Sequence, residues 1–247
     1  MSDMELNAVL QLLDQRKARL DKLRPLPPAL LNNLREELNL RWTYHSNAIE
    51  GNTLTLLETK VVLEGITVGG KLLREHFEAI NHRDAILLLE EIVRQETPFS
   101  EWQIRSLHQL ILKNIDDDNA GRYRTINVRI VGAKHMPPEA VLVAQQMTDL
   151  IGWYQQTMHP IERAARLHTL FVGIHPFTDG NGRTARLLLN LELLKAGFPS
   201  VVVPVEKRLV YYQMLDLAHM LGDDKPFIGL VAELVGESLT LYERALG

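Results

Sequence analysis

The stretch His175-Pro-Phe-Thr-Asp-Gly-Asn-Gly-Arg-Thr-Ala-Arg186 decides both the fold and the chemistry expected of this chain. Its two glycines, Gly180 and Gly182, permit backbone angles that other residues avoid and let a ligand approach the main chain. The stretch leads directly into an apolar pattern with helical spacing, and the free N–H groups at a helix start favour an anion. It therefore predicts an anion-binding loop followed by a helix.

The charged side chains of this loop suit polyphosphate chemistry. Arg183 and Arg186 are three positions apart on the predicted helix, so they share a face and can hold two phosphate groups. Asp179 is a hard oxygen ligand suited to Mg²⁺ on a polyphosphate, with Mn²⁺ as the alternative ion. His175 can accept a proton near neutral pH. Each group alone would be ordinary, but together and in this order they indicate a nucleotide-transfer site.

Apolar residues recur at spacings of three and four along most of the chain, which predicts a mainly all-α fold. Helices are expected on both sides of the loop, at about 161–174 and 183–196. Capping-box spacings, Thr55 with Glu58 and Ser100 with Gln103, predict two further helix starts. The exception is 125–136, where β-branched and aliphatic residues before a turn at 132–135 predict a short β-hairpin.

The amino-acid composition excludes several classes of function for this chain. The 247 residues are 46% apolar and 23% charged, as in an ordinary globular protein, and the net charge of −4 argues against a nucleic-acid binder. The absence of cysteine excludes disulfides, thiolate nucleophiles and cysteine-based zinc sites. The histidines other than His175 lack metal-site spacing and are expected on the surface or in packing.

No segment has the make-up of a signal peptide or approaches the ~20 apolar residues of a membrane span. The expectation is a cytoplasmic protein without membrane contact. The simplest partition is an N-terminal helical extension at 1–45 and one domain at 46–247.

The loop at 175–186 is similar to the signature of the Fic family, His-x-Phe-x-Asp-Gly-Asn-Gly-Arg-x-x-Arg, and fills every defining position. The similarity extends through Gly121–Arg124 and His135–Pro138 before the loop and through Tyr211–Tyr212 after it, so it covers roughly 46–235. It implies a Fic-fold helical bundle in which the hairpin forms a flap beside the catalytic loop.

The resemblance implies a protein adenylyltransferase that moves AMP from ATP to a Tyr, Thr or Ser hydroxyl of a target protein or of itself. His175 would take the proton of the attacking hydroxyl, and Asp179 would hold Mg²⁺ between the α- and β-phosphates. Tyr211 and Tyr212 would lie near the adenine. The phosphates of ATP would be bound by Gly180, Asn181, Gly182, Arg183 and Arg186.

The stretch Ser46-Asn-Ala-Ile-Glu50-Gly-Asn52 resembles the inhibitory signature of family members with an N-terminal inhibitory helix. A glutamate and a γ-phosphate compete well for the same guanidinium. We therefore expect Glu50 to hold Arg186 and to keep ATP from seating its γ-phosphate. In some relatives the same glutamate serves the removal of AMP from the modified protein.

The flap, residues 122–138, would hold the target, because an exposed strand edge can pair with an extended segment. The docking residues would be Thr125, Ile126, Asn127 and Val128. The partners expected are a protein target with an exposed hydroxyl and a second copy of the chain in a homodimer, with no nucleic acid and no membrane.

Two other functions stay open at this point. One is a Fic enzyme that mainly removes AMP, and the other is a catalytically silent nucleotide-binding interaction protein. The intact His175 argues against the silent protein, because a nucleotide sensor needs the phosphate ligands but not a base.

Overall fold

The computed structural model describes residues 2–130 and 132–246, and within them the chain is all-α and contains no β-strand, which confirms the predicted fold class. None of the helices in this part is long and apolar enough to cross a membrane. The helices are α1 (Asp3–Asp21), α2 (Pro28–Ile49), α3 (Leu56–Leu63), α4 (Leu73–Arg94), α5 (Glu101–Leu112), η1 (Ala140–Leu142), α6 (Val143–Tyr154), α7 (Pro160–Ile174), α8 (Asn181–Lys195), η2 (Val205–Lys207), α9 (Arg208–Leu221) and α10 (Lys225–Leu246).

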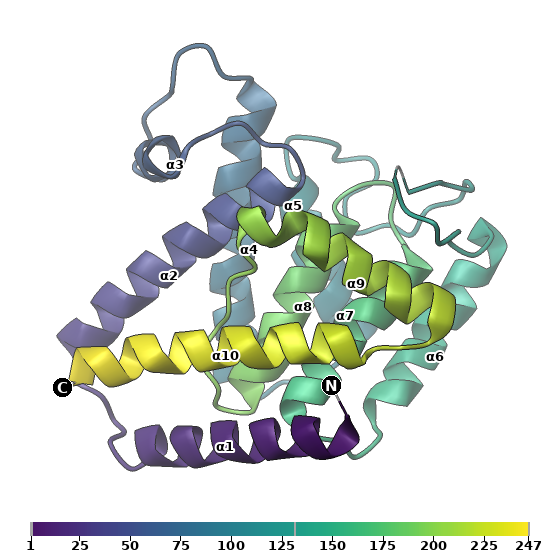
Figure 1. Ribbon diagram of the computed structural model, residues 1–247. Helices are drawn as coiled ribbons and strands as arrows, with labels where there is room; N and C mark the ends of the chain where they lie inside the picture. Colours follow the sequence, from purple (N-terminus) through teal and green to yellow (C-terminus); the bar gives the residue numbers. More distant parts are fainter. Residues whose placement is uncertain (1, 131, 247) are drawn as a thin grey trace.

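Helix α8 forms the centre of the bundle (Figure 1). Most of its residues are buried, including Leu187, Leu188 and Leu191 and several polar side chains, so other helices must cover it on most sides. Helices α7, α4 and α5 pack against it. Because α8 begins at the end of the predicted anion-binding loop, this packing fixes the position of that loop.

The N-terminal helices belong to the same core. Helix α1 lies alongside α10 (Figure 1), where Arg16 and Glu243 form an ion pair at 2.7 Å. Leu10 and Leu13 of α1 join the buried cluster of the central helices. Helix α2 runs unbroken from Pro28 to Ile49, so the boundary expected between 45 and 46 falls inside a helix.

The predicted hairpin is wrong for the described residues of the flap, 122–130 and 132–138, which are extended or turned without a strand ladder. The central residue Val131 lies outside the described part. The physical reason is the buried Arg124, whose guanidinium donates to Ile126 O at 3.0 Å and to Pro138 O at 2.6 Å. The two ends of the flap therefore bond to one side chain and not to each other. Of the residues predicted to dock a target, the exposed ones are Thr125, Ile126 and Asn127, while Val128 is half-buried.

Candidate functional site

The loop between α7 and α8 is shaped by its own residues. His175 ends α7 in the left-handed conformation (φ 50°), and Gly180 (φ 75°) precedes α8. The Asn181 side chain accepts from Phe177 N–H at 3.0 Å and donates to Phe177 O at 2.8 Å. Asn181 therefore closes the loop from inside and holds the backbone amides that would face an anion.

A buried histidine of α5 supports the loop. The ring of His108 stacks on Phe177 (centroids 3.5 Å apart), and its Nε2 lies 2.9 Å from Asp179 O. Its Nδ1 accepts from Gly121 N–H at 2.9 Å. Burial lowers the pKa of His108 to about 4, so the ring is neutral at pH 7. His108 is thus buried as a packing residue would be, and it also contacts the loop directly.

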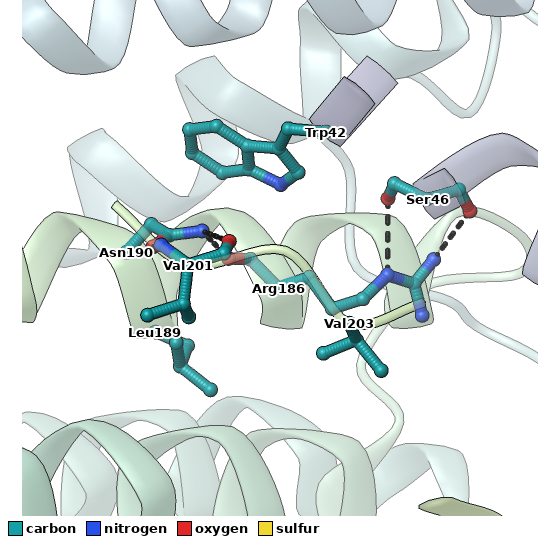
Figure 2. Close-up of a pocket in the computed structure, with 7 residues that line it drawn as sticks. All are labelled: Trp42, Ser46, Arg186, Leu189, Asn190, Val201 and Val203. Atoms are coloured by element: carbon teal, nitrogen blue, oxygen red, sulfur yellow. Dashed lines mark hydrogen bonds between the residues drawn. The ribbon is translucent and has the colours of Figure 1, made fainter. Parts of the chain in front are cut away.

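Arg186 is 2% exposed and is held on several sides. Its Nε donates to Ser46 Oγ at 3.0 Å and its Nη2 to Ser46 O at 2.8 Å (Figure 2), and Nη1 donates to Tyr211 OH at 3.3 Å. The pocket beneath it, lined also by Trp42 and Asn190, has a volume of about 10 Å³, which is room for one water molecule. A nucleotide therefore has to reach Arg186 from the side of the loop.

On that side stands Glu50, at the C-terminal end of α2. Arg186 Nη2 donates to Glu50 Oε1 at 2.7 Å. A Cβ atom on Gly182 would overlap Glu50 Oε1, so the carboxylate lies directly against the first turn of α8. Although burial alone would lower the pKa of Arg186, the charge of Glu50 raises it above its ordinary value. Glu50 thus occupies the place where the start of α8 and Arg186 would together hold an anion.

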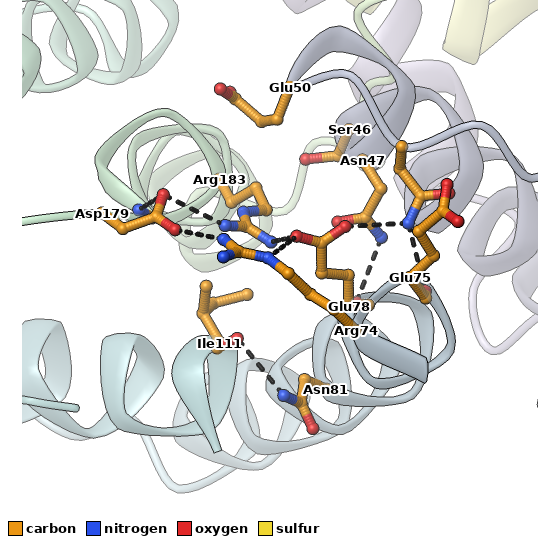
Figure 3. A network of polar contacts seen from close by, with 12 residues as sticks. Ser46, Asn47, Glu50, Arg74, Glu75, Glu78, Asn81, Ile111, Asp179 and Arg183 are labelled. Atoms are coloured by element: carbon orange, nitrogen blue, oxygen red, sulfur yellow. Dashed lines mark hydrogen bonds and ion pairs between the residues drawn. The ribbon is translucent and has the colours of Figure 1, made fainter. Parts of the chain in front are cut away.

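Figure 3 shows a second group of charges, formed by Arg183, Asp179, Arg74 and Glu78. The buried Arg183 lies between Asp179 Oδ1, 3.4 Å from its Nη2, and Glu78 Oε1, 3.3 Å from its Nη1. Arg74 bridges the same two carboxylates, at 2.6 Å from Asp179 and 3.1 Å from Glu78. Burial raises the pKa of Asp179, but Arg183, the Gly180 N–H and Arg74 lower it below its usual value, so this carboxylate is ionised at pH 7.

Asp179 could bind a cation only together with ligands supplied by a bound substrate. The described residues hold no group of three or more side chains that could bind a metal ion. Mg²⁺ is commonly held by one or two carboxylates together with the phosphates of a substrate. The ionised Asp179, at the mouth of an anion-binding loop, matches this arrangement. It would take Mg²⁺ that arrives with a nucleotide.

His175 stands where the loop begins. Burial lowers the pKa of His175 to about 4, so its ring is neutral at pH 7 and can accept a proton. In the described part of the chain, its Nδ1 is buried without a hydrogen-bond partner. The main-chain oxygen of His175 accepts from Arg124 Nε at 2.8 Å, which ties His175 to the flap.

Comparisons with known proteins agree with this geometry. The Fic/DOC family profile matches residues 98–193. Protein adenylyltransferase fic-1 of Caenorhabditis elegans is 41% identical over 223 residues, which are 87% of this chain and 43% of that protein. Protein adenylyltransferase Fic of Drosophila melanogaster is 36% identical over 246 residues, 95% of this chain and 49% of that protein. The chain thus spans about half the length of these relatives.

Two solved structures resemble it over nearly its whole length. A fragment of Fic-1 from C. elegans superposes with a TM-score of 0.89 at 37% identity, covering 98% of this chain and 73% of that one. The chain belongs to the Fic/DOC family. A Fic domain containing signaling protein from Bacteroides thetaiotaomicron gives a TM-score of 0.88 at 30% identity, covering 96% of both chains.

The two tyrosines of this Fic protein that were expected near the adenine have different environments. Tyr211 is 1% exposed, its hydroxyl pairs with His168 Nε2 at 2.9 Å, and burial raises its pKa to about 12. It supports Arg186 from inside and is not open to a nucleotide, so the expected adenine contact does not fit Tyr211. Tyr212 is 38% exposed and donates to Ile49 O at 3.4 Å, so only its ring faces solvent near the site.

Four side chains of the Fic site were missed by sequence reasoning: Arg74, Glu78, His108 and Arg124. Of these four, only Arg124 lies in one of the stretches that carry the family resemblance, Gly121–Arg124, and the resemblance did not indicate what Arg124 does. The other three are single polar residues on helices, a pattern that is usually found on solvated or packing faces. Their roles arise only because α4 and α5 pack against α8.

Proposed function

We propose that this chain is a protein adenylyltransferase that transfers AMP from ATP to a hydroxyl group of a protein, and that Glu50 inhibits it. The observation that carries the proposal is the anion site at the start of α8, filled by the Glu50 carboxylate bound to Arg186 at 2.7 Å and lying beside the neutral base His175. The names of the worm and fly relatives support the same reaction.

In the proposed reaction the target hydroxyl oxygen attacks the α-phosphorus of ATP. A new oxygen–phosphorus bond forms, the bond to the bridging oxygen of the β-phosphate breaks, and pyrophosphate leaves. His175 accepts the hydroxyl proton, and its lowered pKa keeps it free to do so at pH 7. The amides at the start of α8 would stabilise the charge that builds on the phosphate oxygens.

The phosphates would be held by groups that the fold already places together. Arg183 would bind the β-phosphate, and Arg186 the γ-phosphate once Glu50 has left it. Asp179 would hold Mg²⁺, which neutralises charge on the α- and β-phosphates when bound. Asn181 would contribute through the loop shape it maintains, because its amide bonds both main-chain groups of Phe177.

Inhibition would follow from competition for one guanidinium. A charge-assisted hydrogen bond contributes about 1.5–3 kcal/mol, which corresponds to about a ten- to hundredfold loss of productive ATP binding. A γ-phosphate cannot reach Arg186 at the start of α8 while the Glu50 carboxylate stays there. Removing that carboxylate would therefore activate the enzyme.

Removal of AMP from a modified protein is a second candidate activity. The side chain of Glu50 is 32% exposed, and the structure assigns a hydrogen bond only to its Oε1, among the described residues. Its Oε2 could accept a proton from a water molecule placed beside the AMP group. Release of AMP from premodified protein by the wild type, and loss of that release in Glu50→Gln, would support this activity.

The transfer itself is tested with two labels. Glu50→Gly protein is incubated with a protein mixture, Mg²⁺ and ATP labelled at either the α- or the γ-phosphate. We expect protein-bound label from α-labelled ATP alone, because only the AMP moiety is transferred. Label from γ-labelled ATP would instead indicate phosphate transfer and would contradict the proposal.

A further inference from the structure

His108 of α5 makes two hydrogen bonds to two different segments of main chain. Its Nδ1 accepts from Gly121 N–H at 2.9 Å, and its Nε2 lies 2.9 Å from Asp179 O. An amide N–H can only donate and a carbonyl can only accept. The two partners therefore fix one neutral tautomer, with the proton on Nε2.

The same ring shapes the loop by contact. It stacks on Phe177 with the two ring planes 2° apart. A Cβ atom at Gly180 would lie 3.3 Å from the His108 ring and 3.0 Å from Ile111, so the position is closed to larger residues. His108 thus contacts the loop at three places, two of which flank the candidate metal ligand Asp179.

The other bond of His108 fixes the chain that leads into the flap. Gly121 has φ 70°, and its carbonyl accepts from Arg105 Nε at 2.8 Å, so the residue is held at both of its main-chain groups. Three positions later, Arg124 binds both ends of the flap and the main chain of His175. Movement at Gly121 would therefore be passed on to the flap.

We propose that His108 is a positioning residue that holds the phosphate-binding loop and the base of the flap in place, each through its own hydrogen bond. Its Nε2–H bond sets the loop that carries Asp179, and its Nδ1 bond sets the base of the flap that would hold the target. This inference rests on the proposed AMP transfer, because only a reaction of two substrates needs the ATP-binding loop and the target-binding flap to be held in fixed positions relative to each other.

Two substitutions separate the two bonds. In His108→Asn the side-chain amide oxygen takes the place of Nδ1 and can accept from Gly121 N–H. In His108→Gln the amide nitrogen reaches the place of Nε2 and can donate to Asp179 O. In the Glu50→Gly background, His108→Asn should keep the Gly121 bond and lose the Asp179 bond. His108→Gln should do the reverse.

The first readout is binding of a non-hydrolysable ATP analogue with Mg²⁺, measured by calorimetry. The second is hydrogen exchange of the amides at 121–124. We expect His108→Asn to weaken analogue binding about tenfold with little change in exchange, because one hydrogen bond to the loop is lost. We expect His108→Gln to speed amide exchange about tenfold and to change analogue binding by less than about threefold.

His76 offers a matched control. It is also buried and also lies between an amide and a carbonyl, with Val68 N–H at 2.9 Å from Nε2 and Leu72 O at 2.8 Å from Nδ1. His76→Asn and His76→Gln should lower the melting temperature without changing either readout. A nitrogen-15 spectrum of the parent protein should also show the Nε2–H tautomer of His108.

Three outcomes would overturn the assignment of two separate positioning bonds to His108: parallel loss of both readouts in both variants, no change in either readout, or the Nδ1–H tautomer. Neither readout needs catalysis. If the Glu50→Gly protein transfers no AMP, the proposed function fails while the His108 readouts still stand. If it transfers AMP and the two variants change both readouts alike, only the positioning role of the two His108 bonds fails.

Discussion

Arg74 Nη2 lies 2.6 Å from Asp179 Oδ2, so the carboxylate proposed to hold Mg²⁺ forms an ion pair with an arginine of α4. Arg74 also bonds Glu78, which in turn lies 3.3 Å from Arg183. The two arginines of α8 that are proposed to bind phosphates therefore each face a carboxylate of this chain, Arg186 facing Glu50 and Arg183 facing Glu78.

Removal of the Arg74 side chain should strengthen metal binding. In Arg74→Ala, a cation no longer competes with a guanidinium for Asp179. Since Arg74 is half-exposed, the effect should be small, about two- to fivefold in the dissociation constant. Mn²⁺ binding is measured by electron paramagnetic resonance with an ATP analogue in the Glu50→Gly background.

Arg35→Ala is the control for this experiment, because it removes the same charge from another exposed pair, that of Arg35 with Glu90. It should leave Mn²⁺ binding unchanged. Equal or weaker Mn²⁺ binding by Arg74→Ala would mean that Arg74 does not compete with the cation.

Gly182→Ala should lower the free energy of unfolding when Glu50 is present and raise it when Glu50 is replaced by glycine. In the parent protein its Cβ would overlap Glu50 Oε1, so Gly182→Ala should displace the carboxylate and lower the free energy of unfolding by about 1–2 kcal/mol. In Glu50→Gly the carboxylate is gone, and only the end of the Arg186 side chain, 3.1 Å from the Cβ, would have to shift by a few tenths of an ångström. Alanine should then stabilise helix α8 by about 0.5–1 kcal/mol.

Urea unfolding of the four proteins in this cycle gives the coupling energy between the two positions. A value near zero would show that the Glu50 carboxylate does not lie against α8 in solution.

Stability should fall in mild acid because of the buried histidines. The pKa values of His108 and His175 are lowered to about 4, while the unfolded chain titrates near 6.5. Between these values the unfolded state binds more protons, so the free energy of unfolding is constant above about pH 7 and falls as the pH drops below about 6.5. Each histidine should cost about 2 kcal/mol by pH 5.

Urea unfolding at pH 7.5 and pH 5 measures this difference. His108→Gln should show a smaller loss than the parent, because one of the histidines with a lowered pKa is gone. An unfolding free energy that is the same at both pH values would contradict the assignment of neutral, buried rings.

Local patterns predicted the helices well. The expected helices at 161–174 and 183–196 correspond to α7 and α8, because helical periodicity reports which face is buried. Both capping-box spacings mark true helix starts. Thr55 and Glu58 form the reciprocal hydrogen bonds, whereas Ser100 precedes α5 without a side-chain cap.

The remaining features depend on residues far apart in the sequence. The β-branched run of the flap fits a strand, but Arg124 binds its two ends and no ladder forms among the described residues 122–130 and 132–138. His108 and Arg74 gain their contacts with Asp179 only when α4 and α5 pack against α8. Sequence patterns locate the loop and the Glu50 segment, and tertiary packing determines which side chains hold them in place.

Transfer of label from α-labelled ATP with Mg²⁺, compared among the parent protein, Glu50→Gly and Glu50→Gly with His175→Ala, tests the account most directly. We predict about ten- to hundredfold more protein-bound label with Glu50→Gly than with the parent, and none once His175 is also replaced. Equal labelling by the parent and by Glu50→Gly would contradict inhibition by Glu50, and labelling that survives without His175 would contradict its role as the base.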